Sequence, residues 1–259
     1  MHESRFFAWA LGVVLLFLLG PFVVILVASF GSEAIMTFPP EGFSAEWYGR
    51  VLSIASFRDA FTTSLVVALA ATATALILGF PVAYAIVRFD FRGKHAVEVL
   101  FASPAIVPAL VLGFALLRFF VFVLAVPIVP GLYIGHTAVL FPYTVRVISA
   151  SLRNLDPAIE EAAISLGAGR LRTLATVVLP NVRAGVVAAF ILAFITSFNN
   201  VPISLFLTGP GVATLPIEML IYMEYYFDPT IAALSSVLIL FTILIVQGAE
   251  RLLGISKYL

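Results

Sequence analysis

The sequence predicts a bundle of membrane-spanning α-helices, and the composition and the length of the apolar runs are what predict it. Apolar residues make up 62% of the 259 residues and charged residues 11%, against about 45–50% and about 25% in a soluble domain. A helix of about 20 apolar residues crosses a bilayer core of about 30 Å, and runs of this length recur along the chain. We therefore expect lipid around most of the surface.

Six apolar runs are long enough to span the bilayer, and each is predicted as one helix. The first follows Arg5 as a secretory signal would, but it exceeds an apolar signal core of about 7–15 residues, so we expect it to be retained. Pro104 and Pro108 predict a bend near the start of the third. We expect a single transmembrane domain over residues 1–259, with its core over roughly residues 57–252. The predicted spans are Phe7–Phe30, Phe61–Val87, Val97–Phe122, Leu132–Ser151, Val182–Leu207 and Thr230–Leu253.

The sequence lacks residues that several other classes of protein need. It has no cysteine, so it forms no disulfide and offers no thiol nucleophile or thiolate ligand. Its formal net charge is zero, which removes the basic signature of a nucleic-acid binder. A Gly-x4-Gly-Lys-Ser/Thr loop, which cradles ATP phosphates, is absent, and His2, His95 and His136 are too scattered to suggest a metal site. We expect neither an enzyme nor a resident cofactor.

The basic residues predict the orientation, because Lys and Arg concentrate in short cytoplasmic loops. If both termini are cytoplasmic, 11 of the 14 basic residues lie on that side and 3 lie outside. The outer three are Arg50, Arg58 and Arg118; the inner residues are Arg5, Arg88, Arg92, Lys94, Arg146, Arg153, Arg170, Arg172, Arg183, Arg251 and Lys257. Arg118 alone among the three falls inside a predicted span, and we expect its long side chain to extend toward the surface.

The outer segments are rich in acidic residues, and two interpretations stay open. An acidic outer mouth favours a cation through its local potential. Alternatively, these residues form an ordinary solvated loop surface or a rim on which a partner docks. The residues are Glu33, Glu41, Glu46, Asp59, Glu218, Glu224 and Asp228.

The segment between the fourth and fifth predicted spans, Asn154–Asn181, begins with a helix of its own. Asp156 can cap the first free amides, and Pro157 suits the first helical position, where its missing N–H costs nothing. Glu160 and Glu161 lie in the first turns, where the helix dipole favours negative charge. The sequence therefore predicts a short, capped helix outside the bilayer core.

The same segment also contains signals for the end of this helix and for a second one. Gly167 supplies a left-handed stop. A second amphipathic stretch, Leu171–Val178, is expected to end before Pro180, whose ring disfavours helix at the preceding residue. The first helix carries one apolar stripe, formed by Ile159, Ala163 and Leu166.

The spacing of this segment resembles the EAA loop of the permease subunits of ABC importers. Three residues separate Glu161-Ala162-Ala163 from Gly167, and nine more precede Val177-Val178-Leu179-Pro180. The family pattern is Glu-Ala-Ala-x3-Gly-x9-Ile-x-Leu-Pro, so Val177 takes the place of Ile. The alternative is an ordinary amphipathic helix at the membrane surface.

This resemblance implies a six-span, type I ABC importer fold in which the segment Asn154–Asn181, here called the coupling loop, docks into a groove of a cytoplasmic ATPase. Small residues permit close approach, and a carboxylate can pair with a basic partner. The residues to which the resemblance assigns coupling are Glu160, Glu161, Ala162, Ala163, Gly167, Leu179 and Pro180.

The resemblance covers nearly the whole chain and is closest to the second permease subunit of spermidine/putrescine importers. The matching pieces are Arg88–Lys94, Leu152–Asp156, Thr208–Pro210, Leu215–Ile217 and Asp228–Pro229. At Ser197–Asn200 the sequence departs from the polyamine permeases, which carry acidic residues there. The implied partners are an ATPase dimer that binds ATP and Mg, a second permease, identical or homologous, and an extracytoplasmic binding protein. The implied location is the bacterial inner membrane.

Two adjacent amides, Asn199 and Asn200, fall inside the fifth predicted span just before Pro202. Because a polar group exposed to hydrocarbon costs several kcal/mol, they must face protein or water. They are candidates for the lining of a solute pathway, or else they form hydrogen bonds that only hold the bundle together. Weaker candidates for the same lining are Tyr143, Thr196 and Ser197.

Other functions fit the sequence less well. A carrier coupled to a proton or sodium gradient usually needs acidic residues or histidine inside the membrane, and the 14 acidic residues lie in loops or near span ends. A membrane enzyme would need a catalytic constellation. Within the importer class, the solute could be a polyamine, an opine, a phosphonate or an amino-acid derivative.

Overall fold

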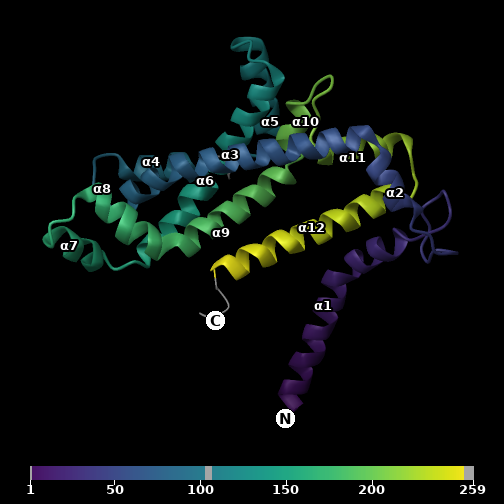
Figure 1. Cartoon of the computed structure of the whole chain (residues 1–259), viewed down its shortest axis with the longest axis horizontal. Coiled ribbons are helices and arrows are strands. Elements are labelled where there is room, and N and C mark those ends of the chain that lie inside the picture. Colours follow the sequence, from purple (N-terminus) through teal and green to yellow (C-terminus); the bar gives the residue numbers. More distant parts are fainter. Residues whose placement is uncertain (1, 103–106, 254–259) are drawn as a thin grey trace. The chain divides into compact units, whose positions relative to one another are not determined.

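The computed structural model describes residues 2–102 and 107–253, which fold mainly into helices (Figure 1). Two of the elements, η2 and η3, are wide helical turns in which each amide bonds five residues back. In chain order the elements are α1 (His2–Ala28), α2 (Glu46–Ser53), α3 (Ala55–Arg88), α4 (Lys94–Ala102), α5 (Ala109–Leu117), η2 (Arg118–Val123), α6 (Ile128–Arg153), α7 (Pro157–Ser165), α8 (Arg170–Thr173), η3 (Leu174–Val178), α9 (Leu179–Phe198), α10 (Pro202–Phe206), α11 (Leu215–Tyr225) and α12 (Thr230–Leu253).

The helices group into two compact units. The first comprises Met1–Arg58 and Glu218–Leu244, and the second comprises Asp59–Ile217 and Ile245–Leu259. Helices α3, α11 and α12 run from one unit into the other. Each of the three points at which the chain passes from one unit to the other therefore lies within a helix.

In the first unit, the apolar helix α1 is tied to the segment that follows it. Trp47 of α2 donates its indole N–H to the Gly31 carbonyl at 2.6 Å, and the Ser29 and Tyr48 hydroxyls lie 2.7 Å apart. Within Phe7–Ala28, no residue of the most apolar stretch is buried inside the described chain. Such a surface suits lipid or another protein chain.

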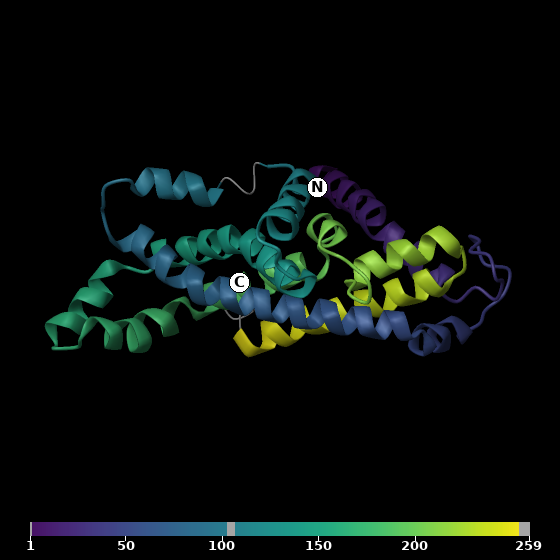
Figure 2. The ribbon, with the colours of Figure 1, turned by 90° about the horizontal axis from the view of Figure 1, so that it is seen from above.

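In the second unit, small residues let the helices pack closely. Ala75 of α3 is fully buried, and the Thr144 hydroxyl of α6 donates to its carbonyl at 2.9 Å. A Cβ added to Gly185 of α9 would collide with Ser151 of α6. Because lipid removes the hydrophobic drive between helices, close packing of small residues is what holds them together. Helices α6 and α9 accordingly lie side by side (Figures 1 and 2).

The structure does not confirm the predicted count of six spans. Five helices among the described residues are long and apolar enough to cross a membrane: Phe7–Ala28, Ala55–Arg88, Ile128–Arg153, Arg170–Phe198 and Thr230–Gly248. Each corresponds to a predicted span, and only the third predicted span has no single counterpart among them.

The third predicted span, Val97–Phe122, is wrong as one continuous helix. It begins in α4 and starts again after Pro108, which has an extended ψ of 128°. Proline lacks the N–H for a helical hydrogen bond and its ring clashes with the preceding turn, so the helix resumes only at Ala109. The resumed apolar helix, Ala109–Val123, is shorter than the five spans. Pro104, the other expected cause of a bend, lies outside the described residues.

The fifth predicted span, Val182–Leu207, is also wrong at its far end. Helix α9 stops at Phe198, and α10 follows as a separate short helix with Pro202 in its first turn. Proline is favourable at this position because the first amides of a helix have no partner inside it. The polar residues Asn199 and Asn200 therefore lie in a break between two helices.

The expected helix end before Pro180 is likewise wrong. The chain is helical from Arg170 to Phe198, with Pro180 in the first turn of α9 and η3 immediately before it. In η3 the amides bond five residues back instead of four, which widens the helix locally. We attribute the tolerance of Pro180 to this change in the hydrogen-bond pattern, because a carbonyl in the wide turn does not depend on an amide four residues ahead.

Candidate functional site

The short helix of the coupling loop begins and ends where the sequence predicts. The Asp156 carboxylate accepts a hydrogen bond from the Ala158 amide at 2.9 Å, and Pro157 is the first residue of α7. After the helix, Gly167 adopts a left-handed φ of 91°. The Ala168 amide then bonds to the Ala163 carbonyl at 3.1 Å. These contacts close both ends of α7 and turn the chain toward α8.

The coupling loop exposes large apolar side chains, and two exposed arginines, Arg170 and Arg172, flank one of them. Leu166 is 89% exposed and Leu171 is 83% exposed. Glu161 and Ala162 are exposed beside them, and Ala163 is half-buried. A run of exposed large apolar side chains around one carboxylate is typical of a surface that another protein covers.

Glu160, by contrast, points into the chain. Its side chain is 7% exposed and lies 2.6 Å from Nε of Arg88, at the end of α3, whose own side chain is 11% exposed. The Tyr84 hydroxyl donates to the other carboxylate oxygen at 2.8 Å. Nη2 of Arg88 donates to the Leu155 carbonyl at 2.9 Å. We call this group of contacts the inner clamp.

Glu160 and Glu161 were both predicted to take part in coupling, and nothing in the sequence indicated that Arg88 and Tyr84 contact Glu160. Helix geometry provides a signal for separating the two acids, since consecutive residues lie about 100° apart around a helix axis. Two adjacent glutamates therefore cannot both face one partner. The remaining coupling candidates, Leu179 and Pro180, are exposed at the start of α9.

The break between α9 and α10 uses one of its two asparagines for capping. The Asn200 side chain accepts a hydrogen bond from the Ile203 amide at 2.9 Å. Asn200 is half-buried, whereas Asn199, the residue that ends α9, is exposed. Asn199 is thus the more accessible of the two pathway candidates.

A buried histidine lies next to this break. His136 of α6 is 2% exposed; its Nδ1 is 2.8 Å from the Ser197 hydroxyl, and its Nε2 is 3.1 Å from the Ser204 hydroxyl. It thereby joins α6 to the end of α9 and to α10. The sequence alone did not identify this role of His136, which was named only as one of three histidines too scattered for a metal site. The signal was a histidine within an apolar run, which needs polar partners from other helices.

The pathway candidates are in two different places. Ser197 is buried against His136 and Thr196 is half-buried. Tyr143 is 43% exposed and lines a pocket of about 440 Å³ together with Arg146, Glu98 and Arg153. None of the candidates between 196 and 200 lines this pocket.

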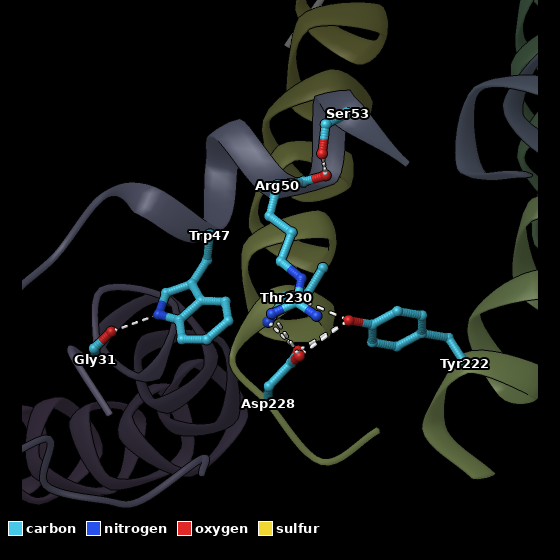
Figure 3. A network of polar contacts seen from close by, with 7 residues as sticks. All are labelled: Gly31, Trp47, Arg50, Ser53, Tyr222, Asp228 and Thr230. Atoms are coloured by element: carbon cyan, nitrogen blue, oxygen red, sulfur yellow. Dashed lines mark hydrogen bonds and ion pairs between the residues drawn. The ribbon is translucent and has the colours of Figure 1, made fainter. Parts of the chain in front are cut away.

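In the first unit, one residue of the predicted acidic surface is buried and paired (Figure 3). Asp228 is 8% exposed and lies 3.4 Å from Nη1 of Arg50. It also accepts hydrogen bonds from the Tyr222 hydroxyl at 3.0 Å and from the Thr230 amide at 3.0 Å. Burial raises the pKa of the Tyr222 phenol, and the nearby Asp228 carboxylate adds to the rise. Asp228 is therefore a structural residue, and its charge is balanced by Arg50.

Comparison with known proteins gives matches along most of the chain. Residues 75–254 match the family described as binding-protein-dependent transport system inner membrane component. The putrescine transport system permease protein PotI of Escherichia coli (strain K12) is 32% identical over 241 residues, which cover 89% of this chain and 85% of that protein. The spermidine/putrescine transport system permease protein PotC of the same strain is 27% identical over 237 residues, covering 89% and 87%.

Solved structures show the same fold at lower identity. A bacterial ABC transporter involved in the import of the acidic polysaccharide alginate matches with a TM-score of 0.75 and 20% identity, over 97% of this chain and 98% of that one. The MetNI methionine ABC transporter matches with a TM-score of 0.60 and 19% identity, over 73% and 91%. These likenesses concern the arrangement of helices and do not bear on the solute.

Proposed function

Because the chain belongs to the family of binding-protein-dependent transport system inner membrane components, we propose that it moves a polyamine or a related amine-bearing solute into the bacterial cytoplasm. The chain is the translocating subunit of an ABC importer. A separate ATPase dimer binds ATP and Mg and supplies the energy. A second permease and an extracytoplasmic binding protein complete the complex, and the coupling loop and both termini face the cytoplasm.

The observation that carries the coupling role is the surface of the loop. Its helix is fixed at both ends by local contacts, at Asp156 and at Gly167. It exposes both Leu166 and Glu161. An apolar side chain beside a carboxylate supplies both burial and a charge-assisted hydrogen bond to a basic partner.

Two glycine substitutions test this docking role. Gly167→Leu forces a bulky residue into a left-handed conformation, which side chains other than glycine rarely adopt. Gly169→Leu adds the same bulk to the same loop at an ordinary φ of −69°. We expect Gly167→Leu to abolish solute-stimulated ATP hydrolysis in the reconstituted importer, and Gly169→Leu to retain most of it. Normal stimulation in Gly167→Leu would refute the docking role.

The polyamine part of the proposal rests on the relatives. PotI, a permease protein of a putrescine transport system, is 32% identical over 89% of this chain. Neutral amides at Asn199 and Asn200 do not select the charge of a solute, because an amide both donates and accepts hydrogen bonds. The solute is therefore tested on the binding protein, which we expect to select it.

The test of the solute is a thermal-shift measurement on the cognate binding protein, followed by uptake into proteoliposomes. We expect putrescine or spermidine to raise the unfolding temperature of the binding protein, and the same compound to be taken up only when ATP is present. A shift with an opine, a phosphonate or an amino-acid derivative alone would overturn the polyamine assignment and leave the importer in place. Uptake driven by an ion gradient without ATP would instead indicate a secondary carrier.

We also propose that the solute passes Asn199, because its amide is exposed at the break in the helix. Asn199→Leu should lower the uptake rate and leave the affinity of the binding protein for the solute unchanged. Asn200→Asp is the matched variant, since a carboxylate still accepts the bond from the Ile203 amide and so preserves the cap. Normal uptake by Asn199→Leu would place the pathway elsewhere.

A further inference from the structure

We propose that Glu160 and Arg88 are positioning residues that pass the movement of α7 directly to α3. The proposal rests on the proposed function, because it concerns how a docked ATPase moves this permease. Along the chain, the coupling loop leads into α9, so α9 is the obvious route for that movement. The inner clamp supplies a second route, to a helix that precedes the coupling loop by more than sixty residues.

The clamp fixes α7 to α3 at two separate points. Both oxygens of the Glu160 carboxylate are held, one by Nε of Arg88 at 2.6 Å and the other by the Tyr84 hydroxyl at 2.8 Å. Nη2 of the same arginine holds the Leu155 carbonyl, just before the α7 cap, at 2.9 Å. Because a guanidinium is planar and its donors point in fixed directions, α7 cannot turn against α3 without breaking these bonds.

Burial makes this connection stiffer than a surface ion pair. The side chains of Arg88 and Glu160 are 11% and 7% exposed, so solvent and salt screen their attraction little. Separating them would leave a buried charge without a partner, which is unfavourable. The nearby pair of Lys94 and Asp90 is different, since its side chains are 29% and 101% exposed and water competes for both charges.

Apolar packing joins α3 to the segments that come before and after α7. Ile86 of α3, Leu152 of α6 and Val178 of η3 are buried in one cluster with Leu155. Interiors packed to this degree transmit displacement because they have few voids in which to absorb it. A shift of α7 is therefore carried to the inner end of α3 by the polar contacts of Glu160, and the apolar cluster holds α3 against the segments on either side of α7.

The structure also indicates where α3 would bend. Pro81 lies inside α3, about two turns before Arg88. A proline inside a helix removes one backbone hydrogen bond and is a common place for a bend. A push on the clamp would thus tilt the last turns of α3, which lie against α6 through Ala83 and Val145.

A distance measurement tests the route without altering the clamp. The chain has no cysteine, so spin labels can be placed at Ala85, a half-buried residue on the part of α3 that follows Pro81, and at the exposed Ser165 on α7. Electron paramagnetic resonance on the reconstituted importer, with its ATPase and second permease, then reports the label separation in the resting and ATP-bound states. We expect the same separation in both states, because the two helices move together. A separation that changes with ATP would overturn the proposal.

Two substitutions of Glu160 provide the functional test, read as solute molecules imported per ATP hydrolysed. Glu160→Ala removes the whole connection, and we expect this ratio to fall about tenfold, a coupling loss of ordinary size. Glu160→Gln keeps an oxygen that accepts from Arg88 and should restore the ratio to within about threefold, as loss of charge alone weakens a hydrogen bond without removing it. Glu160→Ala with an unchanged ratio would overturn the proposal, as would Glu160→Gln behaving like alanine.

Glu161→Ala is the matched control, because this glutamate is the exposed neighbour of Glu160. We expect it to lower ATP hydrolysis and import together and to leave their ratio unchanged. The two proposals can therefore fail separately. Normal ATP hydrolysis in Gly167→Leu would contradict the docking role, and a normal ratio of import to hydrolysis in Glu160→Ala would contradict the role of the clamp. If Glu160→Ala does not assemble with its partners, the label distances decide.

Discussion

Two buried carboxylates, Glu160 in the second unit and Asp228 in the first, are each paired with an arginine, yet they depend on that arginine to different degrees. Glu160 and Arg88 are 7% and 11% exposed and lie 2.6 Å apart. Asp228 is 8% exposed, but Arg50 is 46% exposed and lies 3.4 Å away. Asp228 also accepts from the Thr230 amide, which belongs to its own segment of chain.

The difference teaches what holds a buried charge in place. A backbone amide one or two residues away stays beside its carboxylate whatever happens to a distant side chain. Glu160 has no such bond among those described: its two partners both come from α3. The Asp228 carboxylate is satisfied within its own turn, whereas the Glu160 carboxylate connects segments that are distant in sequence.

The largest loss of stability is expected when the buried arginine, Arg88, is replaced. Arg88→Met should lower the free energy of unfolding by about 3 kcal/mol, because it leaves the Glu160 charge buried without a cation. Thermal unfolding of the purified importer measures this change. The double variant Arg88→Met/Glu160→Met should recover most of the loss, since an apolar pair of similar volume needs no partner. The exposed Arg153, 4.0 Å from Glu98, gives the control, and Arg153→Met should change stability by less than about 0.5 kcal/mol.

An intermediate effect is expected for the phenol that donates to Asp228. Tyr222→Phe should cost about 1 kcal/mol, the usual net value of one hydrogen bond, because Asp228 keeps the Thr230 amide and Arg50. Burial raises the pKa of Tyr222 above its usual value of 10.0, so its contribution is complete below pH 10.0 and falls as the pH rises further. Stability measured against pH should fall less steeply above pH 10.0 in the phenylalanine variant than in the parent chain.

The smallest effect is expected for the exposed arginine. Arg50→Gln should cost less than about 1 kcal/mol, because water and salt already weaken the attraction of an exposed guanidinium. Its guanidinium also lies 5.6 Å from the centre of the Trp47 ring. The free energy of such a cation–π contact at an exposed site is of similar size to that of the exposed ion pair. The difference from the parent chain should shrink as salt is added. A loss as large as that of Arg88→Met would remove the distinction between the two sites.

The local features of the coupling loop were predictable from sequence because they depend on residues a few positions apart. The Asp156 cap bonds two residues ahead, and the left-handed φ at Gly167 follows from the absence of a side chain. The apolar spans were predictable for a similar reason, since length and hydropathy alone decide whether a helix can cross lipid. The match of spacing to the EAA pattern rests on these same neighbouring residues.

The breaks in the helices were harder to predict, because a proline in a membrane-spanning segment can either end a helix or be accommodated within it. Pro108 comes directly before α5 and Pro202 is the first residue of α10, whereas Pro180 lies within a continuous helical run. The wide turn η3 precedes only Pro180. Whether a proline ends a helix depends on whether neighbouring helices and a local change of hydrogen-bond register satisfy the freed groups, and sequence does not state which neighbours are present.

By itself, the sequence determined that this protein is a helical membrane protein with a short capped helix between two spans, because hydropathy, caps and turn residues act over a few positions. Only the tertiary structure decided that Glu160 faces Arg88, 72 residues away in the chain, while Glu161 faces outward. It also decided that the ring nitrogens of His136 lie within hydrogen-bond distance of the Ser197 and Ser204 hydroxyls. The physical reason is that a buried polar group must be paired, but its residue type does not specify which distant partner the packing of helices will bring within reach.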